Sequence, residues 1–279
     1  MYLENRLVAM LDVLGLSNQI KDKNELLSVM ETYKKIISEA RKAVFRNDTM
    51  EGSQTPEVIN FEVGEFVFDT IVLVSPPITT HSTCSFILSV VRLMELFAKN
   101  NMPLRGAIGI GDYCSDEDTQ IFLSNIFKRL SSEEQSQQWS GCVLTPEAEQ
   151  EIISNVMGAI PTSPMQSDIL HNLTIPSKSS EETNRWCLNW MYQLETLDIE
   201  SLLDYMNGDK SKQTGTRSYV DIINDLPDDA KTLPEEFHPA VKLKTIKTRA
   251  SMQVRFENEN GIAVEPGCKE WSLQVFSPV

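Results

Sequence analysis

The sequence predicts an α+β fold with a ferredoxin-like β-α-β-β-α-β core, and three observations lead to this prediction. First, the apolar runs Leu7–Ser17 and Phe66–Val74 have the pattern of buried strands, and each has one carboxylate in its middle, Asp12 or Asp69. Second, two longer segments carry apolar residues at helical spacing. Third, two strand-like runs meet at Gly64, between those helical segments. This order is that of the split unit in which both helices cover one face of an antiparallel sheet.

Six segments form the predicted core, in the order strand, helix, strand, strand, helix, strand: Leu7–Ser17, Asn24–Phe45, Val58–Val63, Phe66–Val74, His81–Asn101 and Leu104–Gly111. The first helix is amphipathic, and the second is apolar nearly all round, which indicates packing on a sheet face. Gly64 predicts a tight turn or a bulge between the second and third strands. The fourth strand is rich in glycine, which lets neighbouring backbones approach closely.

The rest of the chain is less regular. The predicted elements are a short strand leading into a helix over Ile121–Gln138, a strand at Val143–Leu144, a helix opening at Thr145, a strand over Leu170–Lys178, helices over Arg185–Tyr192, Leu197–Met206 and Tyr219–Leu226, and a helix from Pro239 to about Phe256. Asn207–Ser218 is predicted as a polar linker, and Gly267–Phe276 as a terminal strand. We therefore predict a catalytic domain over residues 1–180 and a mostly helical extension over residues 181–279, packed on it.

The predicted topology brings the two unusual carboxylates together. The first and third strands of the core lie side by side at its centre, so Asp12 and Asp69 are expected on adjacent strands. An ionised Asp inside a strand costs several kcal/mol unless a cation or hydrogen bonds compensate it. The simpler alternative is that each carboxylate accepts backbone hydrogen bonds at a bulge or strand end. As a pair, the carboxylates predict a site for hard divalent cations that also bind a phosphate ligand.

Composition and charge exclude several classes of protein. The 279 residues include 40 acidic and 25 basic side chains, a formal net charge of −15, and 41% are hydrophobic, which predicts a sizeable core. So acidic a surface argues against non-specific binding to DNA, RNA or anionic lipid. No apolar run approaches the ~20 residues of a membrane span, and the N-terminus lacks a basic-then-apolar leader. We therefore expect a cytoplasmic protein with no membrane span.

Other chemistries lack support in the sequence. Five scattered cysteines without CxxC spacing predict free thiols, not a zinc site or a disulfide frame. His81, His171 and His238 have no metal-ligand spacing, and no nucleophile elbow is present. The GAIGIG run within Gly106–Gly111 lies in a strand pattern, not at a strand-to-helix turn, so a dinucleotide fingerprint is not expected.

Four stretches follow one another along the chain: Leu11–Ser17, Phe68–Thr70, Leu104–Gly111 and Gln138–Gly141. In this order they resemble the motifs of class III nucleotidyl cyclase catalytic domains. The first is similar to the first-strand motif, in which Asp is followed by two apolar residues, Gly, an apolar residue and Ser or Thr. The set is most similar to the bacterial anti-phage pyrimidine cyclases of Pycsar systems, which make cyclic UMP or cyclic CMP. The resemblance covers about residues 7–190 well and the remainder loosely.

The resemblance implies a mechanism and its residues. Asp12 and Asp69 would hold two Mn²⁺ or Mg²⁺ ions, with the backbone carbonyl of Val13 as a further ligand. With both ions bound, the ribose 3′-oxygen would attack the α-phosphate in line and pyrophosphate would leave. Asn125 and Arg129 stand where these cyclases place an Asn and an Arg that stabilise the reacting nucleotide. The alternative is a helix-capping Asn and a solvated Arg.

Substrate and assembly also follow from the resemblance. Glu65 occupies the position of a base-reading Lys in adenylate cyclases, which counts against ATP as the substrate. Lys178 is the candidate cation for the triphosphate, with Lys242, Lys244 and Lys247 as runners-up. Class III domains work as dimers, so a homodimer would have two shared active sites, in which the metal-binding aspartates of one chain face Asn125 and Arg129 of the other.

The predicted function is therefore a nucleotidyl cyclase that acts on a pyrimidine nucleoside triphosphate, UTP first and CTP next. Its product would be a second messenger in antiviral defence. Two alternatives stay open: a non-catalytic nucleotide-sensing or dimerisation module on the same fold, and a purine cyclase acting on ATP or GTP.

Overall fold

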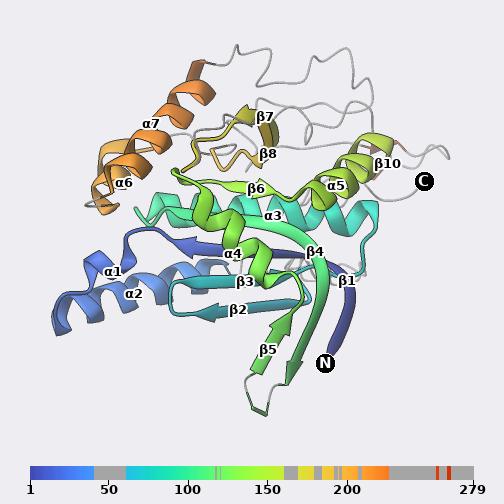
Figure 1. Ribbon diagram of the computed structural model, residues 1–279, viewed down its shortest axis with the longest axis horizontal. Helices are drawn as coiled ribbons and strands as arrows, with labels where there is room; N and C mark the ends of the chain where they lie inside the picture. Colours follow the sequence, from blue (N-terminus) through green and yellow to red (C-terminus); the bar gives the residue numbers. More distant parts are fainter. Residues whose placement is uncertain are drawn as a thin grey trace.

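The computed structural model describes residues 1–40, 61–116, 118–119, 121–159, 169–178, 184–191, 194, 197–206, 209–225, 256–257 and 263–264. A mixed β-sheet runs through the middle of these residues, and helices pack against it (Figure 1). The α+β fold class predicted from the sequence is confirmed.

The predicted β-α-β-β-α-β core is also confirmed. It consists of β1 (Tyr2–Val13), α2 (Lys23–Ala40), β2 (Val63–Val67), β3 (Thr70–Val74), α3 (Thr80–Lys99) and β4 (Leu104–Asp116). The strands lie in the order β2-β3-β1-β4, and each is antiparallel to its neighbour. β1 and β3 are therefore the two central strands of this unit, as predicted. A short helix, α1 (Leu16–Gln19), follows β1.

The turn between β2 and β3 lies at Phe68 and Asp69, and the prediction of a turn or bulge at Gly64 is wrong. Val67 pairs with Thr70, so the turn has two residues, and Gly64 lies inside β2. Phe68 has a φ of 57°, as the first turn residue of such a hairpin requires. Because bulky residues rarely adopt positive φ, the sequence around Phe68 carries no recognisable turn signal.

Four further strands extend the sheet. β5 (Ile121–Ser124) pairs with the far end of β4, and the two form a hairpin that projects at the bottom of Figure 1. β6 (Cys142–Leu144), β8 (Asn184–Leu188) and β7 (Leu170–Thr174) complete the order β2-β3-β1-β4-β6-β8-β7. Two predictions are corrected here. The segment over residues 185–192 contains a strand instead of a helix, and β4 continues to Asp116, beyond the predicted end of this strand at Gly111.

Helices cover the sheet. α4 (Phe127–Ser136) and α5 (Pro146–Ala159) follow the predicted positions, and α2 packs against α3 through an edge-to-face contact of Tyr33 and Phe97. By length and hydropathy α3 could cross a membrane, contrary to the expectation that no segment was long enough. However, 78% of its apolar window is buried inside the structure, which is the behaviour of a core helix.

Two helices follow the sheet, α6 (Ile199–Tyr205) and α7 (Lys210–Asp225). The linker predicted over residues 207–218 is therefore wrong, because α7 begins within it. The helix predicted over residues 239–256 lies outside the described residues except for Phe256, which begins β9 (Phe256–Glu257), and β9 pairs with β10 (Ala263–Val264). The terminal strand predicted over residues 267–276 lies outside them altogether. The division at residue 180 stays a prediction.

Candidate active site

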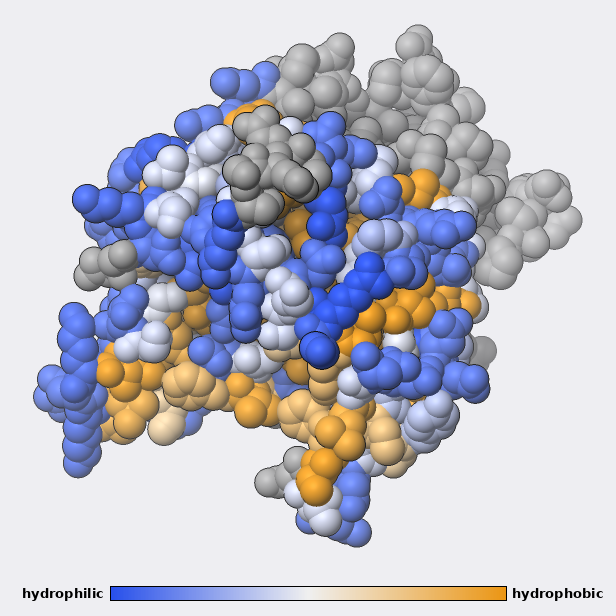
Figure 2. Space-filling model, viewed as in Figure 1, coloured by the Kyte–Doolittle hydropathy of each residue, from blue (hydrophilic) through white to orange (hydrophobic). Residues whose placement is uncertain are grey.

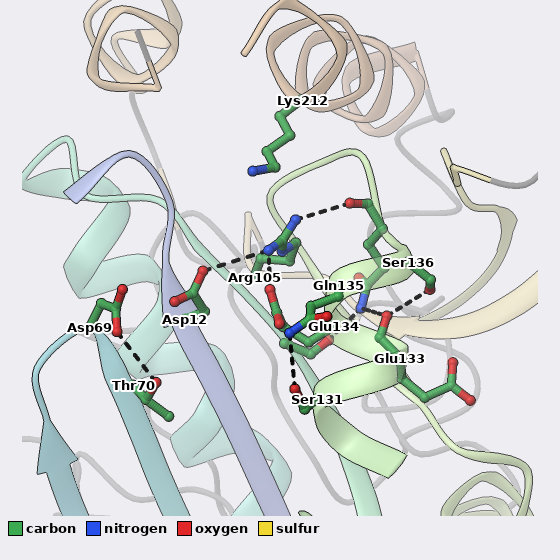
Figure 3. Close-up of polar contacts among 12 residues, drawn as sticks. Asp12, Asp69, Thr70, Arg105, Ser131, Glu133, Glu134, Gln135, Ser136 and Lys212 are labelled. Carbon is green, nitrogen blue, oxygen red and sulfur yellow. Dashed lines mark hydrogen bonds and ion pairs between the residues drawn. The ribbon is translucent and has the colours of Figure 1, made fainter. Parts of the chain in front are cut away.

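The two unusual carboxylates lie side by side at one end of the central strands. Asp12 pairs with Thr70 across β1 and β3, and the N–H of Val13 donates to the carbonyl of Asp69 at 2.9 Å. Asp69 is the second residue of the β2–β3 turn, so the strand pairing itself fixes its position beside Asp12. Both carboxylates point to the same side of the sheet (Figure 3). The predicted juxtaposition of Asp12 and Asp69 is confirmed.

Asp12 lies in an electrostatically unfavourable place. Burial is the main reason that its pKa rises from 3.8 to about 6, and the negative charges of Glu134 and Asp69 add to the rise. Arg105 and Lys212 act in the opposite direction. In the ionised form this carboxylate is short of positive charge, which a bound cation would supply.

Arg105 and Glu134 form a buried ion pair beside Asp12. Arg105 is on β4 directly opposite Asp12, and its guanidinium lies 3.6 Å from the Asp12 carboxylate. The same guanidinium contacts Glu134 of α4 and donates to the carbonyl of Gln137 at 3.1 Å (Figure 3). Burial raises the pKa of Glu134, and Arg105 opposes the rise. The pair fixes α4 to the sheet and holds one oxygen of Asp12 in place.

The donor set fits divalent cations that also bind a substrate. Asp69 accepts a long hydrogen bond of 3.5 Å from the Thr70 hydroxyl, so its carboxylate is weakly held. Among the residues that the structure describes, no group of three or more His, Cys, Asp or Glu side chains gathers as a closed metal cage. Mg²⁺ is commonly bound by one or two carboxylates together with substrate phosphates, and this arrangement matches that pattern. The role of the Val13 carbonyl stays a prediction.

Asn125 and Arg129 lie away from the two aspartates of their own chain. Asn125 precedes α4, which begins at Phe127, so Asn125 and Arg129 do not lie together on this helix. Asn125 accepts a hydrogen bond from the N–H of Asp112 at 3.0 Å, and Arg129 forms an ion pair of 2.6 Å with Glu147. Their proposed role on a second chain stays a prediction.

Glu65 lies on β2 and Lys178 lies beside the end of α4, where its N–H donates to the carbonyl of Ser136 at 2.8 Å. Glu65 of β2 pairs with Val72 of β3, which pairs with Met10, two residues before Asp12. Because alternate residues of a strand share a face, Glu65 is on the Asp12 face of the sheet. Lys178 is exposed beyond β7 and its charge lowers the pKa of Glu134, which indicates that it lies near α4. Lys242, Lys244 and Lys247 lie outside the described residues.

Three charged residues near the aspartates received no role from the sequence: Arg105, Glu134 and Lys212. Arg105 is in a glycine-rich strand. Its position opposite Asp12 follows from the register of β1 and β4, which the sequence alone does not give. Glu134 is on the buried side of α4. Lys212 of α7 points from the other side into the space over Asp12 and Arg105 (Figure 3).

Comparison with known proteins gives weak structural similarities. No protein-family model and no curated protein matches the chain. Among solved structures, the chain is similar to the adenylyl cyclase CyaB from P. aeruginosa, with a TM-score of 0.44 and 9% identity over 68% of this chain and 96% of that one. The chain is also similar to the catalytic core of a rhodopsin-guanylyl cyclase with converted specificity, in complex with ATPαS. The TM-score is 0.43 and the identity 8%, over 68% of this chain and 97% of that one. For the guanylyl cyclase Cya2 the TM-score is 0.41 and the identity 9%, over 67% of this chain and 91% of that one. Similarities of this size leave the activity open, so it has to be inferred from the side chains.

Proposed function

We propose that the protein is a nucleotidyl cyclase, which converts a nucleoside triphosphate to its 3′,5′-cyclic monophosphate and pyrophosphate. The observation that carries this proposal is the position of Asp12 and Asp69. They lie side by side at the end of adjacent central strands, on one side of the sheet, within stretches that resemble the metal-binding motifs of class III cyclases.

In this proposal the chain's own residues bind and orient the reactants. Asp12 and Asp69 would hold two Mn²⁺ or Mg²⁺ ions, with the Val13 carbonyl as a further ligand. When bound, such ions lower the pKa of the ribose 3′-hydroxyl and offset the charge of the triphosphate. Arg105 and Glu134 keep the Asp12 carboxylate oriented, since one oxygen of Asp12 lies beside the guanidinium. Lys178 binds the triphosphate. The 3′-hydroxyl gives its proton to water, and its oxygen bonds to the α-phosphorus as the bond to pyrophosphate breaks.

The finer proposal is a pyrimidine substrate, UTP first and CTP next, which makes the protein a uridylate or cytidylate cyclase. Its support is the resemblance to Pycsar cyclases and the carboxylate of Glu65 on the Asp12 face, where adenylate cyclases have a cation. By the same resemblance, the product would be a second messenger in antiviral defence, made in the cytoplasm.

We also propose a homodimer with two shared active sites. Apolar side chains are exposed along one edge of the molecule, on α2, at the β2–β3 turn and on β5: Leu26, Leu27, Met30, Val67, Phe68, Ile121 and Leu123. Figure 2 shows apolar surface over α2, β2 and the β4–β5 hairpin. Exposed apolar patches of this kind favour protein contacts, and a second copy would bring its Asn125 and Arg129 to Asp12 and Asp69.

A second candidate is a nucleotide-sensing or dimerisation module without catalysis. The observation in its favour is the 3.6 Å approach of Arg105 to Asp12, since the guanidinium partly meets the need of this carboxylate for positive charge. The two candidates differ in turnover, and a single assay separates them.

The assay incubates the full chain with each of the four nucleoside triphosphates and Mn²⁺, with detection of cyclic nucleotides by mass spectrometry. Asp69→Ala is the test variant, and Asp118→Asn, an exposed carboxylate on the β4–β5 loop, is the control. We expect a cyclic UMP or cyclic CMP product that Asp69→Ala loses and the control keeps. A purine product would overturn the pyrimidine assignment. No product from any triphosphate, with the protein folded and dimeric, would favour the module without catalysis.

A further inference from the structure

Lys212 is a charged residue on the buried face of α7. Gly215, Thr216 and Tyr219 are the buried residues three, four and seven positions after it, which is the spacing of one helix face. Lys212 therefore continues this buried face by one more turn toward the start of α7. Its side chain is only 20% exposed, and it points into the space above Asp12 and Arg105 (Figure 3). A charged group in this position is costly to bury unless an anionic group faces it.

α7 is held against the segment that follows α4, and these contacts fix the position of Lys212. The hydroxyl of Thr216 accepts a hydrogen bond from the N–H of Ser140 at 2.7 Å. The backbones approach so closely that a Cβ on Gly215 would lie 2.0 Å from the Gln138 carbonyl oxygen. Both contacts are made to the segment that directly follows α4, the helix that carries Glu134.

An aromatic cluster completes the attachment of α7. The ring of Tyr219 lies between those of Trp139 and Trp190, with ring centroids 4.6 and 5.8 Å apart. Its hydroxyl donates to the amide oxygen of Asn189 at 3.1 Å. Aromatic contacts of this kind stabilise beyond the area they bury, so α7 is fixed along about two turns after Lys212.

The ammonium group of Lys212 is held by Asp209 but keeps donors to spare. Asp209 accepts from the N–H of Lys212 at 3.2 Å, and its other oxygen lies 2.9 Å from the Lys212 ammonium. A lysine ammonium has three donors, and this pair uses one of them. The ammonium group lies beside the space that Asp12, Arg105 and Glu134 border (Figure 3). Lys212 also lowers the pKa of both Asp12 and Glu134, so its charge acts across that space.

The charges of the site call for such a group. A triphosphate carries about four negative charges, which two divalent cations offset, and the carboxylates of Asp12 and Asp69 then remain in excess. Glu134 is already paired with Arg105. A cation from the protein is therefore needed opposite the aspartates, and Lys212 is on that side of the site.

We propose that Lys212 binds the terminal phosphates of the substrate, so that the C-terminal helices supply one wall of the active site. This inference rests on the proposed function only for the name of the substrate; its chemical content is a polyphosphate-binding site shared by Asp12, Asp69 and a lysine from α7. After the reaction Lys212 makes the same contacts with the pyrophosphate product that it made with the triphosphate. Lys178 binds the same phosphates from the β7 side.

The test measures binding of inorganic tripolyphosphate with Mn²⁺ to the full chain by titration calorimetry, so it depends on neither the base nor turnover. Loss of one charge-assisted contact to phosphate predicts a fall in affinity of about tenfold or more for Lys212→Gln. Lys212→Arg is expected to keep most of the affinity. Lys210→Gln, which changes an exposed lysine on the same helix, is the control and is expected to bind as the unaltered protein does.

A merely structural role for Lys212 would give a different result. In that case Lys212→Gln would lower the melting temperature and weaken binding of Mn²⁺ alone as well as of tripolyphosphate, and the proposal would be overturned. Unchanged tripolyphosphate binding in Lys212→Gln and in a second neutral variant, Lys212→Met, would also overturn it. If the unaltered protein binds tripolyphosphate through Lys212 but makes no cyclic nucleotide, the proposed function fails and this inference stands. If it makes a cyclic nucleotide and Lys212→Gln leaves the KM unchanged, this inference alone fails.

Discussion

Asp12→Asn is expected to stabilise the metal-free protein while it removes the proposed activity. The fold raises the pKa of Asp12 from 3.8 to about 6, mainly through burial, so the folded state disfavours the ionised carboxylate. A shift of about two units corresponds to ~3 kcal/mol, and the 24% exposure of the side chain reduces the expected gain to ~2 kcal/mol near pH 7. An amide of the same shape carries no charge and avoids this cost. Arg105 keeps Glu134 as its partner in the variant.

The pH dependence gives the sign of the effect. Well below pH 3.8 the carboxylate is protonated in both the folded and the unfolded state, so the two proteins should be equally stable there. Between pH 4 and 6 the unfolded chain ionises first, the folded chain retains the proton, and the unaltered protein loses stability as the pH rises. The difference between the proteins should therefore open over this range and become constant above about pH 7.

Urea unfolding at pH 4, 5, 6 and 7, in the presence of a chelator, measures this difference. Asp118→Asn serves as the control, since it removes an equal charge from an exposed loop. Addition of Mn²⁺ should stabilise the unaltered protein and leave Asp12→Asn nearly unchanged, because the variant has lost a ligand. Equal stability of the two proteins at pH 7, or a difference that does not vary with pH, would refute the reasoning about Asp12.

Three other outcomes are expected. Asp69→Asn should lower turnover with Mn²⁺ by more than about 100-fold. Its melting temperature should stay unchanged, since within the described part of the chain the Asp69 carboxylate is held only by a long hydrogen bond from Thr70. Cyclic nucleotide formation and a thermal melt measure the two effects. Gly15→Ala should lower the free energy of unfolding in urea by more than ~1 kcal/mol. Gly15 has a φ of 82°, and a Cβ there would lie 2.4 Å from a backbone oxygen of α6. An unchanged midpoint of the urea transition would contradict this packing. Cys114 should react with a maleimide in the native protein. Burial raises the thiol pKa of Cys142 well above its usual range and that of Cys187 to about 12, so these two should react only after unfolding, as peptide mapping by mass spectrometry will show.

The fold could be predicted where a single segment carries the information. Periodicity and length identified the six elements of the core, and the known order of the split unit then placed Asp12 beside Asp69. The β2–β3 turn was missed because Phe68 is not a residue that favours positive φ. β8 was taken for a helix because periodicity cannot separate a short apolar strand from a buried helical piece.

The rest of the site depends on tertiary contacts that no single segment reveals. Arg105 acquires its role from the register of β1 and β4, and Glu134 from the packing of α4 on that strand. Lys212 did have a signal in the sequence, because Thr216, Tyr219 and Ile223 continue its helix face. The polar residues around Lys212 concealed this signal, and the segment was interpreted as a linker.

The aromatic cluster that holds α7 also gives the protein an optical reporter. Trp139 and Trp190 are buried, with 0% and 1% of their surface exposed, and both rings contact Tyr219. If α7 left the sheet, both indoles would meet water, and their fluorescence emission would move to longer wavelength. A ligand that strengthens the contact of Lys212 with the site would slow the release of α7 and so delay this shift in emission. Tryptophan emission can therefore follow the docking of the C-terminal helices in the unlabelled protein.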